Sequence, residues 1–117
     1  MKSALAASLI ATLMASCAST SWPASADPAV MSDTPDYFLV LDRATGARSE
    51  PSGAACRSPL VDPRDGTTLT LIRSIPGIGD YRPDTPRYGL GTKQLLRIDC
   101  SNGRPVGVTD GGPDRGE

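Results

Sequence analysis

Residues 67–74, with the sequence Thr-Thr-Leu-Thr-Leu-Ile-Arg-Ser, decide the fold class of this chain. The side chains alternate, with Leu69, Leu71 and Arg73 on one side and Thr68, Thr70 and Ile72 on the other. This two-residue period predicts a β-strand whose two faces have different surroundings. The preceding residues 62–66, Asp-Pro-Arg-Asp-Gly, form a turn sequence, because proline presets φ at the second turn position and glycine closes the turn. Leu60 and Val61 are therefore expected to lead into this turn as the other arm of a hairpin.

A second hairpin is expected before this one. Residues 37–41 are an apolar run of strand-forming side chains, and residues 42–46, Asp-Arg-Ala-Thr-Gly, follow it. An aspartate that accepts backbone N–H bonds, followed by a glycine that adopts positive φ, is typical of a tight turn with a bulge. A short returning strand is therefore expected at 47–50, and a loop at 51–55.

A third hairpin is expected near the C-terminus. Residues 75–79 are rich in proline and glycine and are expected to form a loop, followed by a short strand at 80–82. Residues 93–100 carry a strand pattern with Leu96, Ile98 and Cys100 on one face. The Asn-Gly pair in 101–104 predicts a tight turn, and residues 105–109 are expected to return as a strand at a sheet edge, because Pro105 cannot donate to a ladder.

Two of these turns share one sequence pattern. Residues 39–46 and 96–103 each consist of an apolar strand, an aspartate, and a glycine four positions later. Two copies are too few for a solenoid, which needs at least about three repeats. We interpret them as one hairpin solution used twice.

These elements predict an all-β domain, a small antiparallel β-sandwich or barrel of about five to six short strands with no helix. The chain has 117 residues, with twelve Gly, eleven Pro, one Phe, one Trp and three Tyr, so its core is small and its turns are many. A domain of this size is marginally stable without a covalent link. A disulfide between Cys56 and Cys100 is expected, and closing a loop of about 45 residues contributes about 4 kcal/mol. The alternative is two free thiols in a reducing compartment.

The N-terminus indicates export. Residues 1–16 combine Lys2 with an uncharged apolar run from Ala4 to Ala15, which is too short to span a bilayer and is typical of a signal peptide. The run ends in 13–17, Leu-Met-Ala-Ser-Cys.

This sequence resembles the lipobox of bacterial lipoproteins, although leucine is usual where Met14 stands. The resemblance covers about the first 20 residues only. It implies that Cys17 is acylated and becomes the first residue of the mature chain, and Ala18 after it implies sorting to the outer membrane, facing the periplasm. The alternative is cleavage after Ala26, in 24–26, Ala-Ser-Ala, which yields a soluble periplasmic or secreted protein. Two cysteines remain to pair after either cleavage, because Cys17 is acylated in the first case and removed in the second.

The remaining chain divides by composition. Residues 17–35 are expected to be a disordered tether, because their few large apolar side chains cannot offset the entropy of ordering. Residues 36–109 are expected to be the folded domain, and 110–117 a disordered tail.

Composition excludes several function classes. The net charge is −1, which argues against nucleic-acid binding. The sequence contains no histidine, so nucleophile–histidine pairs and histidine-based zinc sites are absent. The acidic pairs Asp62 with Asp65 and Asp80 with Asp84 stand in turn sequences, where aspartate serves the backbone. We therefore expect no catalytic residues, no metal site and no cofactor.

Residues 81–88, Tyr-Arg-Pro-Asp-Thr-Pro-Arg-Tyr, are the most unusual local sequence. Tyr81, Arg82, Arg87 and Tyr88 are of the types enriched at binding hot spots, which makes them a candidate interaction loop. The alternative, which the local chemistry favours, is an ordered crossover loop whose arginines stack on its tyrosines and whose Asp84 pairs locally.

Three function classes remain open at this point. The first is a non-enzymatic cell-envelope lipoprotein, attached to the membrane through Cys17, that binds or supports an envelope protein or an anionic polymer. The second is a secreted or membrane-anchored inhibitor of an extracytoplasmic hydrolase, because small disulfide-linked β domains with a rigid loop suit that role. The third is an enzyme that uses carboxylates alone. The sequence does not identify a ligand.

Overall fold

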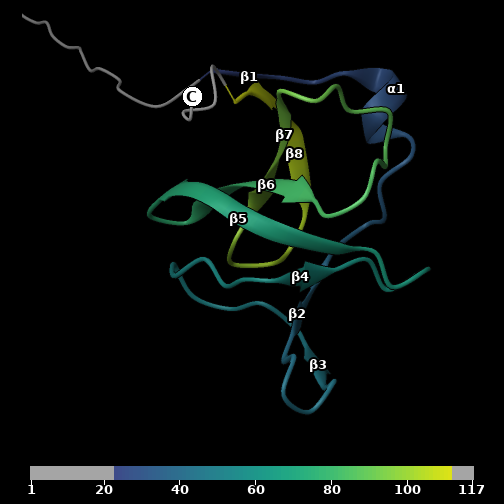
Figure 1. The fold of residues 1–117 in the computed structure, drawn as a ribbon. Coiled ribbons are helices and arrows are strands. Elements are labelled where there is room, and N and C mark those ends of the chain that lie inside the picture. Colours follow the sequence, from purple (N-terminus) through teal and green to yellow (C-terminus); the bar gives the residue numbers. More distant parts are fainter. Residues whose placement is uncertain (1–22, 112–117) are drawn as a thin grey trace, which may run out of the picture.

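The computed structural model describes residues 23–111, which form one antiparallel sheet of eight strands (Figure 1). The strands are β1 (Ala24–Ser25), β2 (Leu39–Leu41), β3 (Arg48–Ser49), β4 (Leu60–Val61), β5 (Thr68–Ile75), β6 (Ile78–Pro83), β7 (Gln94–Asp99) and β8 (Pro105–Asp110). Their order across the sheet is β1-β8-β7-β6-β5-β4-β2-β3. The all-β class is confirmed. The structure has more strands than expected, and they join into a single sheet.

The three predicted turns are present and share one geometry. Asp42, Asp62 and Asp99 each accept a backbone hydrogen bond from the glycine four residues later, at 2.6, 2.9 and 2.7 Å. Each carboxylate also accepts the amide N–H two residues on, at 2.9 Å in all three turns. The aspartate side chain thus orders the turn while the glycine takes positive φ. The returning strands β3, β5 and β8 follow where they were expected.

The prediction of a loop at 75–79 is wrong. Residues 75 and 78 pair directly across a two-residue turn, so β5 and β6 form a continuous hairpin. Pro76 fixes φ at the first turn position and Gly77 has φ of 84°, a combination that turns the chain without a longer loop. Gly77 also donates to Ala54 O at 2.9 Å, which joins the turn to the loop before Cys56.

The β5–β6 ladder contains a bulge between Leu71 and Arg73. Ile72 is the extra residue, and its side chain is 45% exposed. Because of the shift, Arg73 lies opposite Asp80 rather than one position out of register. The bulge therefore places a cation beside a carboxylate on the face of the sheet opposite Tyr81.

The core is enclosed by the curved sheet and by the segments before β2 and after β6. Its buried residues include Val30, Phe38, Leu60, Leu69, Tyr81, Tyr88, Leu96, Ile98 and Val108. The ring of Phe38 meets that of Tyr88 edge to face, with centroids 5.9 Å apart. Phe38 N donates to Gly103 O at 2.8 Å, which ties the chain before β2 to the β7–β8 turn.

The N-terminal part of the described chain differs from the expected disordered tether. Residues 24–25 form β1, which pairs with the end of β8. A single helical turn, α1 (Pro28–Met31), follows, with Asp27 as its N-cap. Val30 on this turn is 2% exposed and belongs to the core. The buried valine, the aspartate cap and the pairing of β1 hold this segment against the domain, although composition alone indicated otherwise.

The predicted disulfide between Cys56 and Cys100 is confirmed, with Cα atoms 5.1 Å apart. It links the loop before β4 to the end of β7. Gly79 on β6 lies against it, since a Cβ there would stand 3.2 Å from Cys100 Sγ and 2.7 Å from the Tyr81 ring. The expected signal peptide 1–16 and the lipidation site Cys17 lie outside the described residues.

Candidate functional site

The structure places the two tyrosines of the candidate interaction loop in the core. Tyr81 lies on β6, fully buried, and its hydroxyl donates to Arg57 O at 2.6 Å. Burial raises the pKa of Tyr81 to about 12. Tyr88 is 2% exposed and adopts a left-handed φ of 64°. Neither ring is available to a partner, so both act as scaffold, in agreement with the crossover-loop interpretation.

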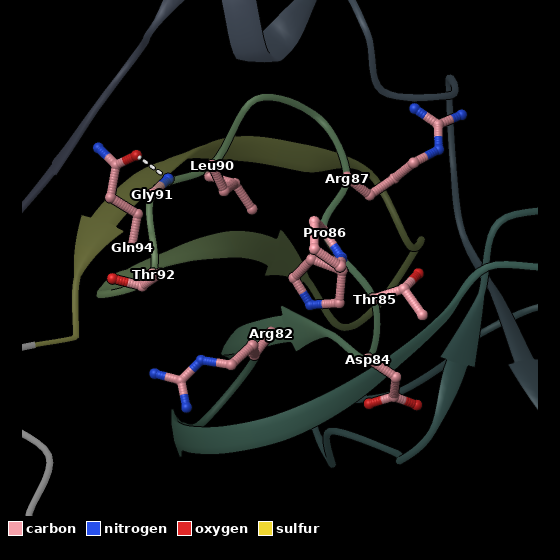
Figure 2. Close-up of a pocket in the computed structure, with 10 residues that line it drawn as sticks. Arg82, Asp84, Thr85, Pro86, Arg87, Leu90, Gly91, Thr92 and Gln94 are labelled. Atoms are coloured by element: carbon pink, nitrogen blue, oxygen red, sulfur yellow. Dashed lines mark hydrogen bonds between the residues drawn. The ribbon is translucent and has the colours of Figure 1, made fainter.

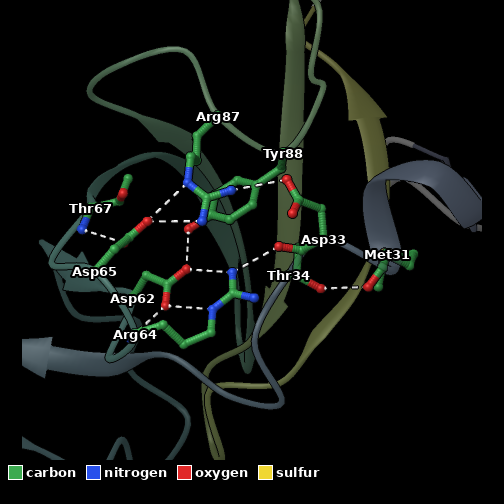
Figure 3. A network of polar contacts seen from close by, with 9 residues as sticks. All are labelled: Met31, Asp33, Thr34, Asp62, Arg64, Asp65, Thr67, Arg87 and Tyr88. Atoms are coloured by element: carbon green, nitrogen blue, oxygen red, sulfur yellow. Dashed lines mark hydrogen bonds and ion pairs between the residues drawn. The ribbon is translucent and has the colours of Figure 1, made fainter.

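Arg87 is also engaged within the fold. Its guanidinium lies over the Tyr88 ring, 4.7 Å from the centroid. It also forms ion pairs with Asp65 at 2.8 Å and with Asp33 at 2.9 Å. The hydrogen bond to Asp65 raises the pKa of Arg87. Arg87 therefore joins the crossover loop to the β4–β5 turn and to the chain after α1 (Figure 3).

Asp62 is the buried centre of the same network (Figure 3). Arg64 Nε donates to Asp62 Oδ1 at 3.1 Å and its terminal nitrogen donates to Oδ2 at 2.8 Å, while the Tyr88 hydroxyl donates to Oδ2 at 2.8 Å. Burial alone would raise the pKa of Asp62, but the hydrogen bonds from Arg64 and Tyr88 lower it below its usual value. Burial and the bond to Asp62 both raise the pKa of Tyr88. This carboxylate is fully occupied in holding the fold.

A second buried carboxylate was not anticipated as such. Asp80 was placed in a turn sequence, whereas it lies inside β6 and is 2% exposed. Arg73 Nε and Arg97 Nε both donate to it at 2.8 Å. The sequence pattern puts Arg73 on the same side as Leu69 and Leu71, whereas the bulge at Ile72 moves it to the side of Asp80, so the pairing could not be read from the alternation alone. Asp80 and Asp84 therefore have separate partners, Asp80 with two arginines and Asp84 with two threonines.

Asp84 belongs to the crossover loop and ties it to β5. The hydroxyls of Thr68 and Thr70 donate to its carboxylate at 2.5 and 2.7 Å, and Arg43 approaches it at 3.5 Å. Burial opposes ionisation, but the two threonine hydroxyls lower the pKa of Asp84. The loop tip at 84–86 is exposed, yet it is held at Asp84 on one side and at Arg87 on the other.

A hollow of about 220 Å³ lies between this loop and the start of β7 (Figure 2). Pro83, Pro86 and Leu90 give it apolar walls, and Arg82 and Gln94 stand at its border. The guanidinium of Arg87 points away from it in Figure 2, consistent with its ion pairs elsewhere. Of the four candidate residues, Arg82 is thus the one whose side chain borders the hollow without being part of the core or of the Asp62 network.

A larger hollow, of about 620 Å³, lies between the β2–β3 hairpin and the segment before β4. Arg43, Ser49, Arg57 and Ser58 contribute polar groups, and Val40 with Pro59 contributes apolar surface. This site was not predictable from the sequence, because its residues come from separate segments that only the pairing of β2 with β4 brings together.

In residues 23–111 there is no group of three or more Asp, Glu, Cys or His side chains arranged to hold a metal ion. The same part of the chain contains no helix with the length and apolar character needed to cross a membrane. Comparison of the chain with known protein families, with curated protein sequences and with solved structures yields no match.

Proposed function

We propose that this chain is a small non-enzymatic cell-envelope lipoprotein, a binding or structural module attached through Cys17 and facing the periplasm from the outer membrane. The observation that carries the proposal is the position of β1. Ala24 and Ser25 pair with Thr109 and Val108 of β8, so the fold uses residues that cleavage after Ala26 would remove. A mature chain beginning at Cys17 keeps this strand, and one beginning at Asp27 lacks it.

The same observation shortens the expected tether. Six residues lie between Cys17 and the first strand residue, Ala24, and the seven Cα–Cα steps from one to the other span at most about 24 Å. A lipid at Cys17 would therefore hold the β1 edge of the domain close to the membrane surface. A disulfide between Cys56 and Cys100 suits the oxidising compartment that the proposal requires.

The engaged state of the buried acidic groups supports a non-enzymatic role. Asp62 is bonded by Arg64 and Tyr88, and Asp80 is bonded by two arginines. A general acid or base needs a carboxylate that can exchange a proton with a substrate, and these two have their oxygens occupied. A binding or structural role needs no such group.

Membrane fractionation tests the proposal. Wild type, expressed in a bacterial host with its own leader, should sediment with membranes and be released by detergent but not by high salt, because the anchor is apolar. Cys17→Ser should leave the protein out of the detergent-released fraction, whereas the matched Ser19→Ala variant should behave as wild type. Equal retention of the Cys17→Ser and wild-type proteins would contradict the proposal.

An inhibitor of an extracytoplasmic hydrolase is the second candidate, favoured by the braced loop tip. Residues 84–86 are exposed but fixed on both sides, by Asp84 with Thr68 and by Arg87 with Asp65. A preordered loop loses little entropy on binding, as tight inhibitors require. If this is the function, replacing Thr85 and Pro86 by glycine should abolish inhibition of the target enzyme while the thermal midpoint changes little. Inhibition that survives the replacement would exclude this loop.

A further inference from the structure

The hollow between the β2–β3 hairpin and residues 57–59 is rich in hydrogen-bond donors. Arg43 and Arg57 line it from separate segments of the chain, and both residues are exposed. Ser58 Oγ accepts the amide N–H of Leu71 at 3.0 Å, which leaves its own hydroxyl hydrogen available to donate. Ser49 is a further lining residue that carries a hydroxyl donor.

Few carboxylates lie near the two arginines of this hollow. Within residues 23–111 the guanidinium of Arg57 has no hydrogen-bond or ion-pair partner, and Arg43 reaches Asp84 only at 3.5 Å with 59% of its side chain exposed. Among the described residues that line this hollow, Asp42 is the one with a carboxylate. Its Oδ1 accepts a hydrogen bond from the amide N–H of Ala44, which orders the β2–β3 turn. By contrast Arg64, Arg73 and Arg97 lie within 2.8 Å of carboxylates. The hollow is thus a positively charged pocket with hydroxyl donors beside it.

We propose that this hollow binds a carboxylate or phosphate group of a soluble anionic polymer. Guanidinium groups bind both oxyanions through two parallel hydrogen bonds, and serine hydroxyls add single donors to the remaining oxygens. The apolar surface of Val40 and Pro59 would contact the uncharged part of the repeating unit.

The position of the hollow argues for a soluble polymer rather than a lipid headgroup. β1 and β3 are the two edge strands of the sheet, and Figure 1 shows the β2–β3 hairpin at the end of the molecule away from β1. A lipid at Cys17 would hold the β1 edge at the membrane, so the hollow would face away from it. This choice of source rests on the proposed function, but anion binding itself does not.

The test uses residues 17–117 with Cys17→Ser, which contains the whole described fold, titrated with poly-L-glutamate and with polyphosphate at low salt. Arg57→Ala together with Arg43→Ala should weaken binding by at least about tenfold, because each arginine would contribute a charge-assisted contact. The backbone carbonyl of Arg57 stays in place for Tyr81, so the fold is retained. Arg104→Ala is the control for loss of charge elsewhere on the surface, since it removes one exposed charge at the β7–β8 turn and should change binding by less than about twofold.

Three outcomes would overturn the inference. One is absence of binding to both polymers by the folded protein. Another is an equal loss in Arg104→Ala, which would show a response to net charge alone. The third is binding to vesicles of anionic phospholipid but to neither polymer. Because the probe protein carries no lipid, these results are independent of acylation: an unacylated mature chain that still binds the polymers would overturn the proposed function and leave this site standing.

Discussion

At the scale of single residues, Asp62 connects more segments of the chain than its place in a turn sequence would suggest. Its backbone orders the β4–β5 turn and its carboxylate holds Arg64 and Tyr88. Arg64 in turn donates to Asp33 O at 2.7 Å, which brings the chain after α1 into the same network. A turn aspartate has thereby become a structural centre, because Tyr88 turns inward with a left-handed backbone to reach it.

Acid should weaken this centre. The pKa of Asp62 is lowered in the folded state, so its contribution to stability is complete above its unfolded pKa of about 3.9 and is lost as pH falls through the folded value. Asp62→Asn should cost about 2 kcal/mol of unfolding free energy at pH 7, and this difference from wild type should shrink below about pH 4. Urea unfolding at several pH values measures it, with the exposed Asp36→Asn as control. A difference that stays constant down to pH 2 would contradict the assignment.

Tyr81 should behave as a core residue and not as a contact residue. Tyr81→Phe loses the hydrogen bond to Arg57 O and should cost about 1 kcal/mol. Tyr81→Ala also leaves a cavity beside Leu71 and the disulfide and should cost about 3 to 5 kcal/mol. Thermal unfolding of the two variants gives these values. Nearly equal midpoints for Tyr81→Ala and wild type would show that the ring is not packed as described.

At the scale of elements, β1 is a two-residue edge strand and both of its residues are exposed. Its removal should therefore be tolerated. A chain that begins at Asp27 should lose about 1 kcal/mol relative to one that begins at Pro23, because only a short ladder is lost. Comparison of the two chains by urea unfolding checks this. Failure of the shorter chain to fold would show that β1 is required rather than merely present.

The elements also show what the sequence could and could not predict. The three aspartate–glycine turns and the strands beside them were predictable, because their signals are local. The loop predicted at 75–79 was wrong because a proline–glycine pair is compatible with both a long loop and a two-residue turn. Only the pairing of Ile75 with Ile78 decides between them. Tyr81 and Tyr88 were placed in a candidate binding loop because hot-spot composition carries no information on which way a ring points.

At the scale of the whole molecule, one disulfide connects segments that the hydrogen-bonded ladders join only indirectly. Cys56 and Cys100 are 44 positions apart in the sequence, and closing such a loop contributes about 4 kcal/mol. A domain of this size has a total unfolding free energy of about 5 to 10 kcal/mol. Cys100→Ser and reduction of wild type should therefore each lower the thermal midpoint strongly. A shift of only a few degrees would show that the small core is sufficient by itself.

The N-terminus of the mature chain decides how the protein is anchored. Intact-mass and peptide mass spectrometry of the unreduced protein, expressed in a bacterial host with its own leader, measures it directly. We expect an N-terminal Cys17 that carries acyl chains, together with a peptide in which Cys56 and Cys100 are linked. A mature chain that begins at Asp27 without any lipid would contradict it.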